Sequence, residues 1–165
     1  MPWTQVKPVV DYAMRGLCTK PYPGHARGCP NFGKRPTCPP ACPRIEDTLD
    51  LANPVFAVYN VFDLASHVAR MRAKHPDWSW RQLVCCLYWQ PAARKALHRG
   101  VENFYFEYLQ RKGGWPGWRL VSAPEGQGVN VTATMKAAGV ELEWPPVTLA
   151  YQVAIVGHRR ETNDG

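Results

Sequence analysis

The chain has 165 residues, 45% of them hydrophobic, and a formal net charge of +7 at pH 7. This is the length of one ordinary domain, and it can build a hydrophobic core without a metal to compensate for small size. No apolar stretch approaches the roughly 20 residues that span a bilayer, and the first ten residues lack the pattern of a signal peptide. We therefore expect a single-domain cytoplasmic protein with no membrane segment and with reduced thiols.

The first third of the chain predicts little regular structure. Residues 1–17 contain a short apolar patch that indicates no definite element. Residues 18–43 are rich in Pro, Gly and Cys, so a regular element is not expected there. Residues 45–51 predict one or two helical turns. Residues 55–62 are almost continuously apolar, with β-branched and aromatic side chains, which is typical of a central strand covered on both faces.

The middle of the chain predicts three helices in succession. Apolar side chains recur every three or four residues, which gives each helix one buried face. Asp63 can cap the first helix, a capping box at residues 79–82 begins the second, and Pro91 suits the first turn of the third. The predicted helices span residues 64–75, 79–89 and 91–112.

The last third predicts a short strand at 119–123, a helix at 131–138, an alternating strand at 140–144 and a buried strand at 149–156. Together these patterns predict an α/β fold. We expect one domain spanning residues 1–165, with a small mixed sheet of three to four strands, at least four helices and a cysteine-rich loop at one edge. The polar residues 158–165 predict a frayed tail.

Residues 18–43 form the most informative segment, because they hold four of the six cysteines in a polar loop, three of them followed by proline. This pattern favours a soft-metal site. The spacing Cys-x10-Cys-x8-Cys-x3-Cys contains one short pair, whereas structural zinc sites usually use two. Iron–sulfur clusters accept irregular spacing, since their four irons spread the ligands around a larger object, and Cys-Pro also occurs in ferredoxin loops. The candidate ligands are Cys18, Cys29, Cys38 and Cys42.

We expect a [4Fe–4S]-type cluster as the cofactor, with zinc as the alternative. The clustering of the cysteines and the cytoplasmic setting argue against disulfides. Four thiolates around a 2+ group would lower the net charge to roughly +5, which still suits an anionic substrate or nucleic acid. The basic residues are scattered along the chain, however, and that distribution favours an ordinary solvated surface.

At these cysteines the chain resembles an uncharacterised family of prokaryotic and viral proteins described as predicted metal-binding proteins. That family carries Cys-Pro-Asn-Tyr-Gly followed by Cys-Pro-Pro, and the equivalents here are residues 29–33 and 38–40. A second family element resembles residues 125–131, but Gln127 stands where relatives often have cysteine. The resemblance implies metal binding that includes Cys18 as the upstream cysteine. Cys42 is then either the fourth ligand or absent from the ligand set, which would leave one iron open.

Four charged residues outside the cysteines are candidates for a catalytic role. Glu125 lies in a glycine-containing loop that opens a helix, and free N–H groups there can hold an anion. Lys34 and Arg35 lie between two candidate ligands. Arg94 lies on a helix expected beside the loop. The adjacent Cys85 and Cys86 would point about 100° apart on a helix, so we expect them to pack in the core.

Three hypotheses for function follow. The first is a cluster-binding protein that is a small enzyme or a redox accessory, with a small anionic substrate or an electron-transfer partner. An enzyme of this kind would use redox chemistry or an open iron as a Lewis acid. The second is a zinc-stabilised module whose aromatic-rich middle contacts nucleic acid or a protein. The third is a viral accessory protein with a structural metal.

Overall fold

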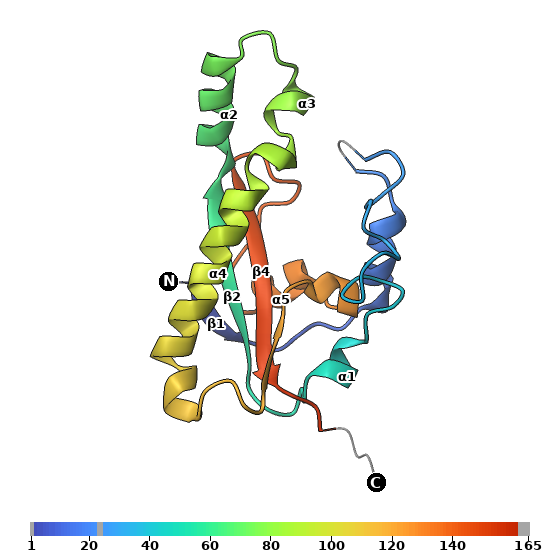
Figure 1. Cartoon of the computed structure of the whole chain (residues 1–165), viewed down its shortest axis with the longest axis vertical. Coiled ribbons are helices and arrows are strands. Elements are labelled where there is room, and N and C mark those ends of the chain that lie inside the picture. Colours follow the sequence, from blue (N-terminus) through green and yellow to red (C-terminus); the bar gives the residue numbers. More distant parts are fainter. Residues whose placement is uncertain (1, 23–24, 162–165) are drawn as a thin grey trace.

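The computed structural model describes residues 2–22 and 25–161, and its centre is one four-stranded sheet in the order β1-β2-β4-β3 (Figure 1). Every neighbouring pair of strands is antiparallel. The α/β class and the number of strands are confirmed, but the expected mixed sheet is wrong in its pairing. Strands β2 and β3 point in the same direction, but they do not pair, because β4 lies between them and is antiparallel to both. The strands are β1 Trp3–Val6, β2 Val55–Asp63, β3 Trp118–Val121 and β4 Leu149–His158.

Strands β2 and β4 form the core of the sheet, and both were predicted because their apolar runs are long. They pair from Val55 opposite Gly157 to Asp63 opposite Leu149. Alternate side chains point to opposite faces, so Phe56 and Val58 enter one hydrophobic cluster while Val55 and Ala57 enter another. The sheet is therefore covered on both faces along this half of β2, as its continuous apolar sequence indicates.

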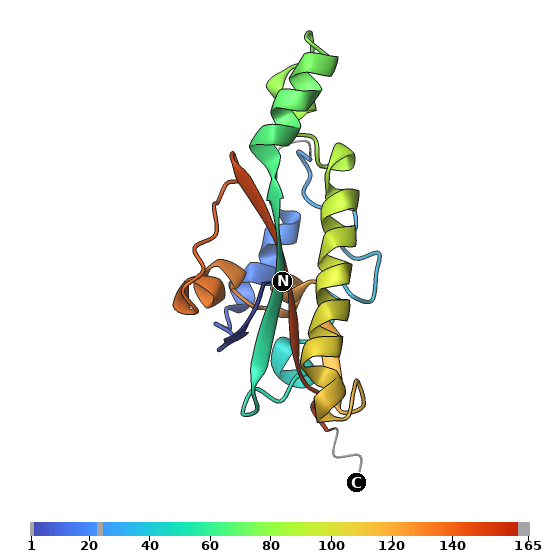
Figure 2. The ribbon, with the colours of Figure 1, turned by 90° about the vertical axis from the view of Figure 1, so that its left-hand side faces the viewer.

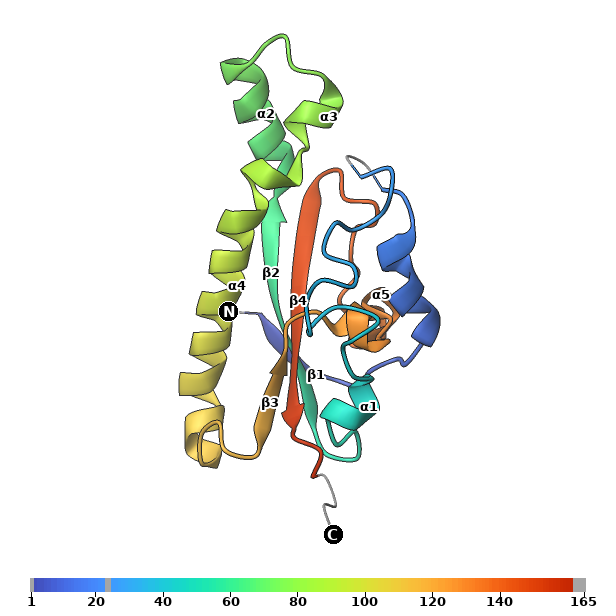
Figure 3. The same ribbon diagram turned by 45° about the vertical axis from the view of Figure 1, so that its right-hand side comes forward.

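Helix α4, Gln90–Glu107, covers one face of the sheet, and its Phe104 is fully buried. The opposite face carries α1, Ile45–Thr48, and α5, Val131–Ala137 (Figures 1 and 3). Buried side chains of α1 and α5 join Ala57 and Ile155 of the sheet in one cluster. The cysteine-rich loop enters α1 directly, so the fully buried Ile45 anchors the end of that loop to the sheet.

Two strand predictions differ from the structure. Residues 140–144 form a loop, because the Glu143 carboxylate turns back to accept the backbone N–H groups of Val147, Thr148 and Leu149. Strand β1 was not predicted, since four residues are too few for a clear alternation. It is held by tertiary packing: the Trp3 ring lies 5.1 Å from the Phe104 ring, centroid to centroid.

Helices α2, Leu64–Lys74, and α3, Trp80–Leu83, project beyond the end of the sheet (Figures 1 and 2). The Asp63 cap and the capping box at Ser79 are both present. The helix predicted for 79–89 is shorter, because the Val84 carbonyl accepts the Trp89 indole N–H while the Tyr88 N–H bonds Cys85 instead. The 3-10 helices of the described residues are η1 Tyr12–Thr19, η2 Cys86–Tyr88, η3 Leu109–Lys112 and η4 Pro124–Gln127.

The first residues of the predicted frayed tail, His158 to Arg160, are hydrogen-bonded to the rest of the fold. His158 is the last residue of β4. The backbone N–H of Arg159 donates to Gly117 at 2.8 Å, and that of Arg160 donates to Thr48 at 3.1 Å. The rest of that prediction, residues 162–165, lies outside the described residues. Within the described ranges, no helix combines the length and the apolar character needed to cross a membrane.

Candidate functional site

Three segments that are distant in sequence meet on the face of the sheet opposite α4: η1, the cysteine-rich loop and η4 (Figure 3). The Asp11 N–H donates to Gly128 at 2.7 Å, which joins the start of η1 to the end of η4. The Cys42 thiol donates to the Gly126 carbonyl at 3.0 Å, which joins the loop to η4. These contacts place all four loop cysteines and the Glu125 segment in one region.

Cys18 and Cys29 are held together by their backbones. The Cys29 N–H donates to the Cys18 carbonyl at 2.7 Å. Gly28 makes this approach possible, since it has a φ of +82° and a Cβ there would lie 2.6 Å from the Cys18 oxygen. Any other residue at position 28 would push the two cysteine backbones apart.

Cys38 and Cys42 are held together by a single turn. The Cys42 N–H donates to the Cys38 carbonyl at 3.0 Å, and residues four apart in such a turn lie on the same side. Arg15 fixes this turn from outside, because its guanidinium donates to the carbonyls of Cys42 at 2.9 Å and Pro40 at 3.2 Å. The Cys42 side chain is 2% exposed, whereas Cys18, Cys29 and Cys38 are each partly exposed. Cys42 is therefore the inner member of the group.

The pKa of Cys18 is affected by the other three cysteines of the loop. Burial raises the pKa of the Cys18 thiol, and the charges of Cys29, Cys38 and Cys42 raise it further. Like charges act this way on a titrating group only over short distances. Burial also raises the pKa of Cys42, while the positive charge of Arg15 opposes that rise.

Glu125 is the one charged candidate that the fold brings to the cysteines. Its charge contributes to the raised pKa of Cys18. Although the Glu125 side chain keeps an exposed surface, the protein atoms around it displace bulk water, and this desolvation raises its own pKa. A side chain that is solvent-accessible and yet surrounded by protein suits a group that meets a ligand from solution.

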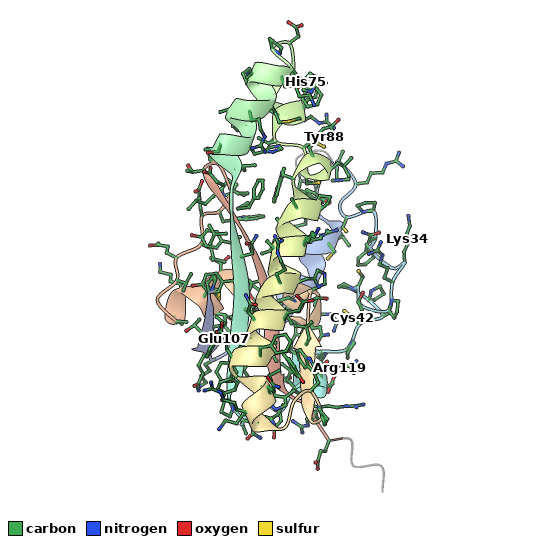
Figure 4. The ribbon with its side chains drawn as sticks, turned by 60° about the vertical axis from the view of Figure 1, so that its left-hand side comes forward. Lys34, Cys42, His75, Tyr88, Glu107 and Arg119 are labelled. Atoms are coloured by element: carbon green, nitrogen blue, oxygen red, sulfur yellow. The ribbon has the colours of Figure 1, made fainter. Side chains whose placement is uncertain are left out.

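The side chains of the other charged candidates make no contact with the cysteines among the described residues, although the Arg35 carbonyl accepts the Cys38 N–H at 3.0 Å. Lys34 and Arg35 are exposed, and Lys34 lies at the outer edge of the loop (Figure 4). Arg94 lies on α4, across the sheet from η4, where it donates to Gln90 of the same helix at 3.2 Å. We expected a pocket between the loop, the Glu125 segment and the helix that carries Arg94. That helix lies on the other face of the sheet and therefore does not line the cysteine site.

The four thiols lie in one region of the fold, but they do not form a compact site for a single ion. Among the described residues, no three His, Cys, Asp or Glu side chains come together closely enough to hold one metal ion. A tetrahedral zinc site needs four ligand atoms at about 2.3 Å from one ion. An iron–sulfur cluster does not require its four thiolates to meet at one ion, since each thiolate binds a different iron atom. The donor chemistry, four thiols from one loop, fits either occupant.

We expected Cys85 and Cys86 to lie on one helix and to pack in the core, but Cys85 is the N-cap of η2, Cys86 is its first residue, and both are partly exposed. Cys86 packs against the cluster that contains Leu64 and Trp89. The charges of Cys29 and Cys86 both raise the pKa of Tyr22, after burial as the largest cause. Cys29 and Cys86 are therefore both near Tyr22.

Several residues that shape the site carry no signal in the sequence. Arg15 is one, and Tyr12 is another, because its ring packs so closely on Gly128 that a Cβ there would lie 2.5 Å from it. Arg44 lies over the same ring, 4.5 Å from its centroid. The Gln127 side-chain oxygen is buried and has no hydrogen-bond partner among the described residues. Only a structure shows these contacts, since each joins segments far apart in the chain.

Comparisons with protein-family models, with curated proteins and with solved structures found no match to this chain.

Proposed function

We propose that this chain binds an iron–sulfur cluster of the [4Fe–4S] type through Cys18, Cys29, Cys38 and Cys42. The observation that carries the proposal is the gathering of four thiols into one region by separate contacts of η1, the cysteine-rich loop and η4. The resemblance of residues 29–33 and 38–40 to a predicted metal-binding family favours the same class of cofactor.

The surrounding residues have distinct roles in this proposal. Gly28 lets Cys18 and Cys29 approach, and Arg15 holds the turn that carries Cys42 while placing a positive charge beside it. A bound cluster supplies electron transfer, or Lewis-acid chemistry where one iron lacks a protein ligand. In this proposal the site serves a small anionic substrate or an electron-transfer partner, and Glu125 is the charged candidate beside it. Free thiols of this kind suit a reducing cytoplasm.

The test is purification of the full chain without oxygen, followed by analysis of iron, acid-labile sulfide and zinc and by a visible absorption spectrum. We expect a coloured protein with iron and sulfide in equal amounts. The variant Cys29→Ala should lose both, and the control Cys85→Ala should keep them, because Cys85 lies at the α3–η2 turn. A colourless protein that carries one zinc and no sulfide would overturn the proposal.

That zinc outcome defines the second candidate function, a metal-stabilised binding module. The observation that favours it is local, since the Cys38–Cys42 turn provides one short ligand pair. In that case chelation should unfold the loop and lower the Tm, because the binding energy of a structural zinc is folding energy. Zinc loading and cluster loading are distinguished by the metal and sulfide analysis alone.

A further inference from the structure

The α2–α3 projection carries a concentration of positive charge. Residues 64–99, which run from α2 through the first half of α4, contain seven Lys and Arg against the single acid Asp77, a net +6 of the +7 of the whole chain. Three of the seven, Arg94, Lys95 and Arg99, lie on α4, and the other four lie on the projection itself. Figures 1 and 2 show α2 and α3 standing beyond the end of the sheet. The protruding surface thus presents four basic residues against one acid, a net charge of +3.

The same projection carries a stack of aromatic rings. The His75 and Trp78 rings are nearly parallel, with centroids 4.0 Å apart, and the Trp78 and Tyr88 centroids are 5.2 Å apart. Figure 4 shows His75 and Tyr88 on the same side of the projection. Tyr88 is 54% exposed, so the stack ends in a ring that is open to solvent.

A second ring on the projection is also open. Trp80 begins α3 and is 53% exposed, and Leu87 beside Tyr88 is 77% exposed. Large apolar side chains at this exposure are not explained by core packing. The backbone beneath them is fixed, because the Ser79 capping box starts α3 and Arg72 donates to the carbonyls of Pro76 and Trp78. The open rings therefore stand on an ordered support.

We propose that the α2–α3 projection binds single-stranded nucleic acid, with Trp80 and Tyr88 stacking on unpaired bases and the exposed Lys74 and Arg81 contacting phosphates. Charge complementarity favours this occupant, since a surface with four basic residues and one acid attracts the phosphate backbone. The open rings select the single-stranded form, because the faces of paired bases are already covered by their neighbours. This site is separate from the cysteines and does not depend on what they bind.

The test is fluorescence anisotropy of the full chain with labelled DNA and RNA single strands of about 20 nucleotides, and with the matching duplex. We expect both single strands to bind more tightly than the duplex at low salt. A preference between DNA and RNA would identify the sugar that the site accepts. Affinity should fall with salt, with a log–log slope of about −0.7 for each phosphate contacted.

Matched variants assign the binding to the projection. Trp80→Ala and Tyr88→Ala should each weaken binding by roughly 5- to 100-fold without changing the salt slope. Phe106→Ala is the control, because Phe106 is 62% exposed at the far end of α4. Lys74→Ala and Arg81→Ala should each reduce the slope by about 0.7, while Lys136→Ala on α5 should not change it.

Three outcomes would overturn the proposal. One is no detectable binding to single strands at low salt. Another is equal affinity for the duplex, since stacking would then contribute nothing. The third is binding that Trp80→Ala and Phe106→Ala weaken equally, which would make the projection a contact surface for a protein or an ordinary solvated surface. All variants replace exposed side chains, and an unchanged Tm confirms that each one is folded.

Discussion

The thiol of Cys42 donates a hydrogen bond to the carbonyl oxygen of Gly126, 3.0 Å away and 84 positions later in the chain. The contact is buried, and it is the direct link between the cysteine-rich loop and η4. Gly126 is also packed closely against the loop, because a Cβ there would lie 3.3 Å from the Pro39 ring and 3.8 Å from the Cys42 sulfur. The inner end of the cysteine group is thus held by close packing as well as by any metal it binds.

Replacement of Cys42 distinguishes a ligand from a structural thiol. Cys42→Ala leaves the Gly126 oxygen buried without a donor and leaves a small cavity, so we expect a loss of about 1–3 kcal/mol in the free energy of unfolding. Cys42→Ser keeps a donor and should lose less. If Cys42 is a ligand, both variants should lose iron and sulfide alike. Retention of the full cluster content in Cys42→Ala would remove Cys42 from the ligand set and support an open iron.

Gly28→Ala should damage the site more than Gly33→Ala. Both glycines have positive φ values, +82° and +71°, so both alanines carry about the same backbone strain. A Cβ at position 28 meets the Cys18 oxygen at 2.6 Å, whereas one at position 33 meets nothing within 4 Å. We expect Gly28→Ala to reduce metal content severalfold and Gly33→Ala to retain it, as measured by metal analysis. Equal losses would show that the approach of Cys18 to Cys29 is unimportant.

Gly128→Ala should lower stability more than Gly139→Ala. Both residues have a left-handed φ, which costs alanine about 1–3 kcal/mol. Position 139 is otherwise open, but at position 128 the Cβ would lie 2.5 Å from the Tyr12 ring. Denaturant unfolding should therefore show an added loss for Gly128→Ala, which Tyr12→Ala in the same chain should partly restore. A double variant no more stable than Gly128→Ala would contradict the packing argument.

Glu143 should make the stability of the fold depend on pH. Hydrogen bonds from the backbone N–H groups of Thr148, Leu149 and Val147 lower the pKa of this carboxyl below its ordinary value of 4.5. Its folded pKa is depressed, so its contribution is fully present above about pH 4.5 and is lost as the pH falls through the folded value. Glu143→Gln should lower the Tm at pH 7, and this difference should shrink in acid. Glu141→Gln, on an exposed side chain, is the control.

Local sequence patterns predicted the elements whose hydrogen bonds are local or whose apolar runs are long. Strands β2 and β4, the Asp63 cap and the Ser79 capping box belong to this group. The expected strand at 140–144 failed because the Glu143 side chain captured backbone donors from the residues that follow, an arrangement that alternation cannot reveal. The helix predicted for residues 79–89 ends at Val84 instead, because the Val84 carbonyl accepts a hydrogen bond from the Trp89 indole N–H.

The sequence by itself determined which residues are candidates for function: four cysteines in a loop that has little apolar area to bury, and a helical segment, residues 64–99, with a net charge of +6. The tertiary structure alone decided which of the charged residues accompany those cysteines. Glu125 comes to them because η4 and the loop lie on one face of the sheet, while α4, which carries Arg94, packs on the other. The physical reason is that a sheet separates its two faces, and the face on which each connection packs depends on contacts between residues far apart in the chain.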